Sequence, residues 1–432
     1  MRMLVLGAGV SGTAAARLAD RIGHRVVVYE RDETRAERLA AAGFIVVSGE
    51  WTTALLDGID VVVTSPGFAE WSPPLVDAAS AGVEVWSEVE FAFRHIDRPV
   101  VAVTGTNGKT TVTELISSML EAEGYEAPPF GNIGTPLSQA VDAVLDVAVV
   151  EVSSFQLRFI DTFRPRVAVV TNVAADHLDW HRTVDAYRQA KARIFERQGS
   201  GDDLVYDATD EGATTLVGSA RARRWPVVSD AGEGRWGVGG GMLRFPGGEL
   251  PLAEVPVTDP TFLTDLALAA VAVTRLGVGA EPIAEVASRF RPAPHRRTEV
   301  ARWRDVTFVD DSKATNPHAA LAAIDALAPV VLIAGGQAKG LDLRPLVAHR
   351  GVRRVVAIGE AAASLQEMDP RKVVRAPDLT TAVREAAEAA NPGDTVLLAP
   401  GCASFDMFGS YAERGEAFAE AVSTLMHEEV AR

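Results

Sequence analysis

The sequence predicts an α/β protein of three domains, and three observations lead to this prediction. A chain of 432 residues is longer than one hydrophobic core of ordinary size can serve. Short apolar strands alternate with helical stretches, a rhythm typical of parallel sheets with helices on their faces. Three glycine-punctuated segments each begin with such a strand, which divides the chain into residues 1–97, 98–293 and 294–432.

The first segment carries a dinucleotide-type fingerprint. A strand at residues 3–6 runs into Gly7, Gly9 and Gly12, and an alanine-rich helix continues to about residue 20. A second strand at residues 25–30 ends in the acidic Glu30. A G-x-G-x-x-G turn with an acid downstream is typical of a Rossmann-like domain. Another apolar strand at residues 60–64 leads into a Ser-Pro-Gly turn.

The second segment contains a phosphate-binding loop, TGTNGKTT at residues 104–111, between a β-branched strand and a helix over residues 111–123. Backbone N–H groups of such a loop and the N-terminus of the following helix hold phosphate. We expect Lys109 to neutralise the β- and γ-phosphates of ATP and the Thr110 hydroxyl to bind Mg²⁺. The usual pattern has glycine where this chain has Val103, so the motif alone indicates a variant of an ATPase-like P-loop domain.

An acidic residue beyond the next long strand would complete a cation site. Glu151, after an apolar strand at residues 146–150, is the candidate, and a helix-capping carboxylate is the alternative. On the residues alone, His177 is most simply a solvated or capping loop residue. Lys191 is most simply an exposed helix lysine.

The remaining segments predict structural elements rather than parts of a catalytic site. Residues 230–250 are rich in glycine and indicate hairpins and loops, and apolar helices follow at about 262–276 and 281–290. Residues 291–294 contain two prolines and predict a linker. The third segment repeats the α/β alternation, with strands near residues 307–309, 330–333, 355–358 and 395–398, and predicts a second Rossmann-like domain.

Composition limits the classes of function. A net charge of −16 argues against binding nucleic acid or a membrane surface, which favours a basic face. No apolar run reaches the roughly 18–20 residues that cross a bilayer, and no signal-peptide pattern is seen. The single Cys402 excludes an internal disulfide, and we interpret it as a small buried residue rather than a nucleophile. We therefore expect a cytoplasmic protein without membrane insertion. As a separate expectation, the protein is a monomer.

Several blocks taken together resemble the Mur ligase family of peptidoglycan synthesis, and in particular its D-glutamate-adding members. TGTNGKTT is similar to that family's own variant of the ATP loop, which accounts for Val103. The other blocks lie at residues 131–134, 151–157, 176–179, 190–195, 310–316, 335–340 and 400–408, in order along nearly the whole chain.

The resemblance implies a role for each matching position. The UDP part of the substrate would lie against Val10, Ser11, Arg31, Ser65, Pro66, Gly67 and Asn132. ATP would be held by Gly105, Thr106, Asn107, Gly108, Lys109, Thr110 and Thr111, with Asp311 and Lys313 of the third domain. Mg²⁺ would be bound by Thr110, Glu151, His177 and Lys191, the lysine being carbamylated because an ammonium cannot ligate a metal. D-Glutamate would lie among His295, Arg296, Thr315, Lys339, Ser404, Phe405 and Tyr411.

The implied reaction is ATP-dependent amide-bond formation. The L-alanine carboxylate of UDP-N-acetylmuramoyl-L-alanine would become an acyl phosphate, and the amine of D-glutamate would then displace phosphate. Lys109, His177 and Lys191 would be the catalytic residues, and ATP and Mg²⁺ the required cofactors. Because the contributing residues come from three domains, we expect the third domain to close onto the second.

Two departures from the family pattern concern the ends of the site. The family usually has His-Asn and a second Asn near residue 262, where this chain has Phe262 and Asp265. Either adenine is held differently or nucleotide selectivity is relaxed. In addition, Glu299 lies one residue further from the His295–Arg296 pair than the family pattern has it.

Three other functions compete with this interpretation. The glycine fingerprint and Glu30 would suit an NAD-dependent dehydrogenase, although the ATP loop argues against it. A sister ligase could add L-alanine, a diamino acid, or glutamate in a polymer, but the block at residues 403–406 favours glutamate. A catalytically dead scaffold conflicts with the joint presence of Lys109, Glu151, His177 and Lys191.

Overall fold

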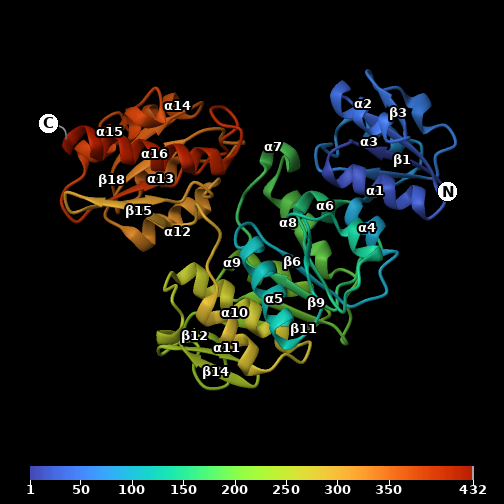
Figure 1. Ribbon diagram of the computed structural model, residues 1–432, viewed down its shortest axis with the longest axis horizontal. Helices are drawn as coiled ribbons and strands as arrows, with labels where there is room; N and C mark the ends of the chain where they lie inside the picture. Colours follow the sequence, from blue (N-terminus) through green and yellow to red (C-terminus); the bar gives the residue numbers. More distant parts are fainter. Residues whose placement is uncertain (431–432) are drawn as a thin grey trace. The chain divides into compact units, whose positions relative to one another are not determined.

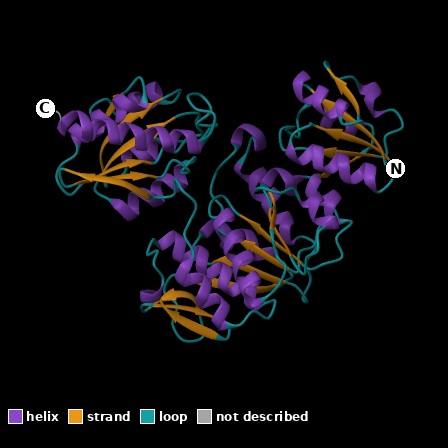
Figure 2. Cartoon of the chain, in the orientation of Figure 1, coloured by secondary structure: helices purple, strands orange, loops and turns teal. Residues whose placement is uncertain are grey.

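A computed structural model of the chain describes residues 1–430, and within them three sheets follow one another along the sequence (Figures 1 and 2). The sheets cover residues 2–87, 100–251 and 298–398, one in each predicted domain. The three-domain α/β prediction is confirmed. Packing groups the chain into two compact units. The first unit holds Met1–Val173, Thr183–Thr258 and Phe262–Phe290, and the second holds Ala174–Arg182, Asp259–Thr261 and the chain from Arg291 onward.

The first sheet is parallel, with strand order β3-β2-β1-β4-β5. Its strands are β1 (Arg2–Leu6), β2 (Arg25–Glu30), β3 (Ile45–Ser48), β4 (Val61–Thr64) and β5 (Glu84–Ser87). Its helices are α1 (Val10–Arg21), α2 (Glu33–Ala41), α3 (Pro73–Ser80) and α4 (Glu88–Phe93). Gly12 lets α1 pack closely on the sheet, because a side chain there would collide with the Gly7 carbonyl oxygen. The strand order reverses at β1, which makes the carboxyl ends of β1 and β4 the natural place for a ligand.

The second sheet has strand order β14-β13-β12-β11-β10-β9-β6-β8-β7. Its strands are β6 (Val100–Thr104), β7 (Pro129–Gly131), β8 (Ala148–Glu151), β9 (Val167–Val170), β10 (Asp203–Asp207), β11 (Arg223–Val228), β12 (Trp236–Gly239), β13 (Met242–Phe245) and β14 (Gly248–Pro251). The pairs β12–β13 and β13–β14 are antiparallel and form a meander, and the remaining neighbours, including β11 and β12, pair in parallel. This meander confirms the hairpins predicted for the glycine-rich residues 230–250.

Helices cover the second sheet and bury its apolar residues. They are α5 (Lys109–Glu123), α6 (Ser154–Arg158), α8 (Val184–Ala192), α9 (Glu211–Leu216), α10 (Pro260–Thr274) and α11 (Ala280–Arg289). Every residue from Leu266 to Val273 of α10 is buried, so this helix runs through the core that it shares with α5 and α11. A short helix, α7 (Leu178–His181), belongs to the second unit instead.

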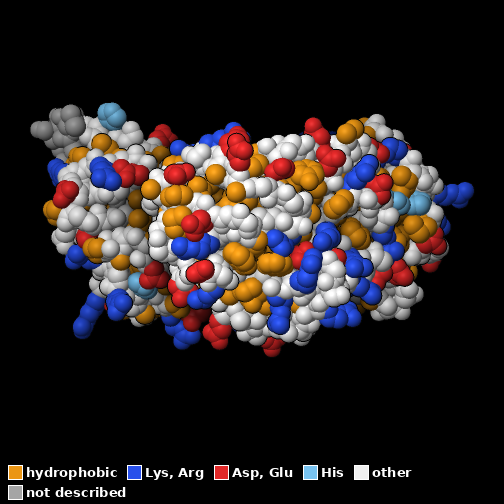
Figure 3. All heavy atoms as spheres, turned by 90° about the horizontal axis from the view of Figure 1, so that it is seen from below, with side chains coloured by type: hydrophobic (Ala, Val, Ile, Leu, Met, Phe, Trp, Pro, Cys, Tyr) orange, Lys and Arg blue, Asp and Glu red, His pale blue; other side chains and the backbone are white. Residues whose placement is uncertain are grey.

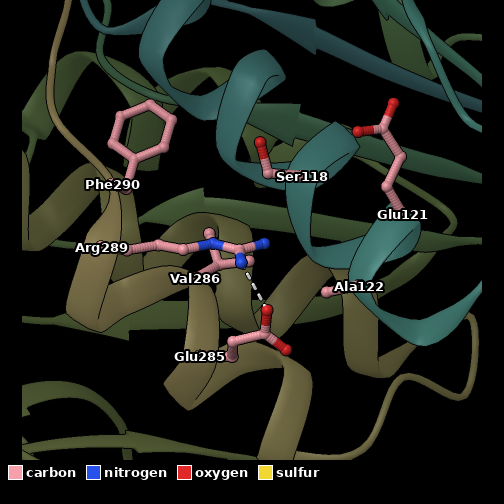
Figure 4. A pocket seen from close by; sticks show the side chains of 7 residues that line it. All are labelled: Ser118, Glu121, Ala122, Glu285, Val286, Arg289 and Phe290. Carbon is pink, nitrogen blue, oxygen red and sulfur yellow. Dashed lines mark ion pairs between the residues drawn. The ribbon is translucent and has the colours of Figure 1, made fainter.

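A surface pocket lies between α5 and α11, lined by Ser118, Glu121, Ala122, Glu285, Val286, Arg289 and Phe290 (Figure 4). Glu285 and Arg289 form an ion pair of 2.5 Å along one side of it. Ser118 lies nine residues after Lys109 in α5, which is about 13 Å along a helix axis. The pocket is therefore distinct from the phosphate loop.

The third sheet has strand order β15-β16-β20-β17-β18-β19. Its strands are β15 (Thr298–Trp303), β16 (Val306–Asp310), β17 (Val330–Gly335), β18 (Val352–Ile358), β19 (Val373–Arg375) and β20 (Thr395–Leu398). Its helices are α12 (Pro317–Leu327), α13 (Arg344–Ala348), α14 (Ala362–Met368), α15 (Leu379–Ala389) and α16 (Tyr411–Val430). Two separate apolar clusters cover its two faces. Apart from the antiparallel β15–β16 hairpin, neighbouring strands pair in parallel, as predicted.

The predicted elements agree with the structure to within a few residues. The helix expected from residue 111 begins at Lys109, and the strand expected from residue 146 begins at Ala148. Residues 291–294 contain no helix or strand, as expected of a linker. In the part of the chain that the structure describes, no helix is long and apolar enough to cross a membrane. On the face drawn in Figure 3, acidic and basic side chains are interspersed.

Two buried carboxylates of α4 join the first sheet to the second. Glu90 is fully buried and accepts hydrogen bonds from the backbone N–H groups of Asp161 (3.0 Å), Thr162 (2.9 Å) and Phe163 (3.0 Å). Glu88 accepts one from the Ser138 N–H (2.5 Å), and burial raises its pKa. These bonds link α4, which follows the first sheet, to backbone of the second domain, and the two sheets belong to one compact unit.

We expect Glu90→Ala to destabilise the protein by about 3–5 kcal/mol, because it leaves several backbone N–H groups without their acceptor and the Arg94 guanidinium without its buried partner. Urea denaturation followed by tryptophan fluorescence measures the change. Glu285→Ala is the control, since it removes only an exposed ion pair and should cost less than about 1 kcal/mol. Equal shifts for the two variants would contradict the role given to Glu90.

Candidate functional site

The phosphate loop lies at the carboxyl end of β6 and leads into α5. Gly108 is the N-cap of α5 with a φ of +82°, and a side chain there would collide with the Asp265 carboxylate. The Lys109 ammonium folds back over the loop and donates to the carbonyl oxygens of Gly105 (3.0 Å) and Thr106 (2.9 Å). A cation, a helix N-terminus and a glycine-rich turn therefore meet at one place, which suits a polyphosphate.

The end of β9 holds this loop in shape. Thr106 N donates to the Asn172 carbonyl (2.8 Å), and Asn107 N donates to the Asn172 side-chain oxygen (2.9 Å). The Thr171 hydroxyl donates to the Asn107 carbonyl (2.5 Å). Sequence reasoning gave Thr171 and Asn172 no role. Their position could have indicated this role, because they directly follow β9, a strand that pairs in parallel with β6.

Glu151 stands at the carboxyl end of β8, on the other side of β6. Its side chain is buried, with Oε2 accepting from the Thr110 hydroxyl (2.8 Å) and Oε1 from the Asn132 amide (2.8 Å). The helix-capping alternative is wrong, because Ser153 forms the capping box of α6 with Gln156. Three of the predicted residues, Thr110, Asn132 and Glu151, thus form one hydrogen-bonded group.

Lys191 is buried, so its interpretation as an exposed helix lysine is wrong. The side chain points inward from α8 and donates to the Gly105 carbonyl at 2.6 Å. Its ammonium also lies 4.6 Å from the centre of the Tyr187 ring. Lys109 and Lys191 therefore converge on the same carbonyl oxygen beneath the phosphate loop.

His177 lies in the second unit, whereas Thr110, Glu151 and Lys191 lie in the first. It has a left-handed backbone with a φ of +52° and begins α7. Within residues 1–430, no group of three or more His, Cys, Asp or Glu side chains is gathered as a metal site. The predicted set of metal ligands stays a prediction.

A polar group forms in the third domain where β16 ends and α16 begins. His295 Nδ1 and Asp310 Oδ2 are 2.6 Å apart, and the His295 ring lies edge-on to Tyr411, with 6.3 Å between centroids. Lys313 donates to the Tyr411 hydroxyl at 3.2 Å. The histidine packs so closely on α16 that a side chain at Gly415 would collide with its ring. Predicted residues for ATP and for D-glutamate are thus brought together here.

Arg414 is a buried residue that sequence reasoning missed. Its guanidinium donates to the Ser312 carbonyl (2.9 Å) and to the Cys402 carbonyl (3.2 Å), and burial lowers its pKa to about 10. It thereby fixes the loop after β16 to the block that carries the buried Ser404 and the exposed Phe405. Cys402 is buried too, and burial raises the pKa of its thiol to about 12, as expected of a packing residue rather than a nucleophile.

The other predicted amino-acid contacts are dispersed. Lys339 pairs with Asp176 at 3.0 Å. Thr315 donates its backbone N–H to the Lys313 carbonyl (2.9 Å). The Arg296 Nε is buried without a hydrogen-bond partner.

In the first domain the predicted UDP contacts follow the carboxyl ends of three strands. Val10 and Ser11 come after β1, Arg31 after β2, and Ser65, Pro66 and Gly67 after β4. The Arg31 guanidinium lies over the Phe68 ring at 5.1 Å. Glu30 is buried and accepts from the backbone N–H groups of Ala8 (2.6 Å) and Arg31 (2.7 Å). The acid that would contact a dinucleotide ribose is therefore turned onto the backbone.

The residues that replace the family asparagines have different surroundings. Phe262 is buried in the core, and its ring stacks on Phe290 with 6.0 Å between centroids and 19° between planes. Asp265, one helical turn later, places its carboxylate against Gly108 of the phosphate loop. The group beside the phosphate loop is therefore the carboxyl group of Asp265, where an asparagine would place an amide with N–H donors.

Comparisons with known proteins identify the family of this chain. The chain matches the models of the Mur ligase MurD-like N-terminal domain over residues 1–87, the Mur ligase middle domain over 103–234, and the Mur ligase glutamate ligase domain over 296–402. The UDP-N-acetylmuramoylalanine--D-glutamate ligase of Frankia casuarinae is 43% identical, covering 97% of this chain and 93% of its own. Proteins of the same name from Corynebacterium efficiens and Salinibacter ruber are each 40% identical over 98% of this chain and over 94% and 98% of their own.

Solved structures of low sequence identity share the fold. UDP-N-acetylmuramate-alanine ligase MurC of Thermotoga maritima aligns with a TM-score of 0.57 at 18% identity, covering 98% of this chain and 99% of that one. A pseudomurein peptide ligase type C from Methanothermus fervidus gives 0.61 at 18% identity, with the same coverage. Because all three domain models match and the relatives above reach 40% identity or more over almost the full length, the chain belongs to the Mur ligase family, in its MurD-like branch.

Proposed function

We propose that this protein is a ligase that joins D-glutamate to UDP-N-acetylmuramoyl-L-alanine, with ATP cleaved to ADP and phosphate, in the cytoplasmic synthesis of peptidoglycan precursors. The observation that carries the proposal is the convergence of Lys109, Lys191, Thr110 and Glu151 around the loop after β6. The names of the relatives, at about 40% identity, support the choice of substrates.

The loop residues would bind and orient the phosphates of ATP. Backbone N–H groups at the start of α5 and the Lys109 ammonium would face the developing negative charge, and phosphoryl transfer depends mainly on such positioning and charge neutralisation. Transfer of the γ-phosphate to the L-alanine carboxylate gives an acyl phosphate. The amine of D-glutamate then attacks the acyl carbon, the amide bond forms, and phosphate leaves.

The residues beside the loop fit a magnesium ion. Glu151 and Thr110 offer a carboxylate and a hydroxyl, the hard oxygen donors that Mg²⁺ prefers. Lys191 as an ammonium cannot ligate a cation, whereas its carbamate would present carboxylate-like oxygens at the same place. Bound Mg²⁺ would neutralise charge on the phosphates. His177 would complete the ligand set from the segment that belongs to the second unit.

The substrates of this reaction are anions, and the domains offer donors for them. The UDP group would lie along the carboxyl ends of β1, β2 and β4, after which Ser11, Arg31 and Ser65 are found. The two carboxylates of D-glutamate suit the cationic and hydroxyl groups of the third domain, among them Arg296, Lys339 and Ser404. We propose that the enzyme acts as a monomer without a nucleic-acid partner.

We expect phosphate release from ATP and UDP-N-acetylmuramoyl-L-alanine to be stimulated by D-glutamate. A coupled phosphate assay with a panel of D- and L-amino acids measures this. Glycine and D-alanine serve as controls, because neither carries the second carboxylate that the third domain would bind. Stimulation by L-glutamate or a diamino acid, with none by D-glutamate, would overturn the substrate assignment.

We expect Lys191→Ala to abolish turnover while the affinity for UDP-N-acetylmuramoyl-L-alanine stays unchanged, since Lys191 lies beneath the phosphate loop and not in the first domain. Steady-state rates and isothermal titration calorimetry measure the two quantities. The matched control is Gln189→Ala, an exposed residue of the same helix, which should leave both unchanged. Full activity of the Lys191 variant would remove this residue from the mechanism.

Asp311, the proposed nucleotide contact, provides a test by pH. Burial raises its pKa from an ordinary 3.8 to about 7, although the nearby Arg297 acts in the opposite direction. Between about pH 4 and 7 the folded state therefore keeps a proton on Asp311 that the unfolded chain has lost. Folding stability falls as pH rises through this range and levels off above it.

We expect Asp311→Asn to flatten this pH dependence, because an amide has no proton to lose. Melting temperatures at pH 5 and pH 8 measure the difference, and the wild-type protein should lose more between them than the variant. Asp305→Asn, at an exposed position, should behave as the wild type. Parallel profiles for wild type and the Asp311 variant would show that Asp311 is ionised in the folded protein at both pH values.

A further inference from the structure

The segment Ala174–Arg182 packs with the third domain, although the chain on either side of it belongs to the first unit. It carries the proposed metal ligand His177 and the short helix α7. Leu178 of this segment lies beside Gly340 of the third domain, because a Cβ added at Gly340 would be 3.8 Å from the Leu178 Cβ. A proposed ligand of the phosphate end is thus attached to the domain proposed to bind the amino acid.

Asp176 makes the polar contacts that fasten this segment. Its Oδ1 accepts from the Lys339 ammonium at 3.0 Å, and its Oδ2 accepts from the Asn316 amide at 3.0 Å. Oδ1 also accepts from the backbone N–H of His177 at 2.8 Å. Asp176 is 4% exposed, so water screens these contacts little. One buried anion therefore holds two side chains of the third domain and the backbone of the histidine.

Both partners are themselves held by the third domain. Asn316 is the N-cap of α12, where its side-chain oxygen accepts from the Ala319 N–H, so its amide nitrogen is aimed at Asp176. Lys339 follows β17 and has a left-handed backbone with a φ of +52°. An ammonium has three donors, and the bond to Asp176 uses one, so Lys339 can bind a substrate carboxylate while Asp176 keeps it in place.

We propose that Asp176 is a positioning residue that couples the amino-acid site to the phosphate site. Its contact with Lys339 orients a donor for the carboxylate of the incoming amino acid. Its bond to the backbone N–H of His177 fixes the position of the histidine, so one side chain positions both groups. The proposal rests on the proposed function, since that function places Lys339 and His177 in their sites.

The first test measures order in the segment without substrate or metal. Hydrogen–deuterium exchange followed by mass spectrometry is compared for wild type, Asp176→Asn and Asp179→Asn. Asp179 is an exposed acid three residues away in the same segment, which makes it the matched control. We expect exchange in residues 174–182 to rise about tenfold or more in Asp176→Asn and to stay at the wild-type rate in Asp179→Asn. Equal exchange in the two variants would overturn the proposal.

The second test separates positioning from general stability. We expect Asp176→Asn to raise the KM for the amino acid about tenfold, with the KM for the UDP substrate unchanged. Lys339→Met should raise the same KM. The double variant should have the same KM for the amino acid as Lys339→Met alone, because both changes break the contact between Asp176 and Lys339. Independent, multiplying effects would overturn the coupling. If Asp176→Asn does not fold, Asn316→Ala replaces it, since this change removes the bond to the Asp176 Oδ2.

The two failures can be told apart. If the wild-type enzyme proves to use another amino acid, the proposed function fails, and the exchange comparison still stands because it contains no substrate. If D-glutamate is the substrate and exchange does not respond to the Asp176 change, the coupling fails and the proposed function stands.

Discussion

The carboxyl edge shared by β6, β8 and β9 is the constraint on which the rest of the site depends. The three strands are parallel neighbours, so the residues after each of them must emerge at the same edge of the sheet. The phosphate loop comes after β6, Glu151 ends β8, and Thr171 and Asn172 come directly after β9. Their hydrogen bonds join positions 41 to 65 residues apart in sequence. A change of register in this sheet would separate the phosphate loop from Glu151 and from the hydrogen bonds of Thr171 and Asn172.

Buried charges mark the places where separate parts of the chain are fastened together. Glu90 joins the first two sheets, Lys191 supports the phosphate loop, and Arg414 ties two loops of the third domain. A charge removed from water is expensive unless hydrogen bonds compensate it, and each of these has them. An alternative arrangement would leave such a charge without partners, so these residues disfavour arrangements other than the observed one.

The strands and loops that could be predicted from the sequence are those whose pattern lies within a few neighbouring residues. β-Branched runs, glycine turns and the pair of prolines at 291–294 depend on neighbouring residues, so β1, β6, β17 and the linker were found at nearly the right places. Short strands such as β7, which has three residues, carry too little pattern to be recognised. Lys191 was misjudged on its residues alone, because only the packing of α8 shows that its side chain turns inward. Asp176 had no visible partner, since Asn316 and Lys339 lie 140 and 163 residues further along the chain.

The burial of Cys402 has a practical consequence for following motion in this protein. Cys402 is the single cysteine of the sequence. It is fully buried in the core of the third domain, and burial raises the pKa of its thiol, which favours the protonated, unreactive form. A maleimide dye added to the native protein should therefore find no competing thiol. Cysteines introduced at exposed positions such as Val144 in the first unit and Met368 in the second would accept a donor and an acceptor fluorophore in the wild-type background. Single-molecule energy transfer could then follow the two units through a catalytic cycle.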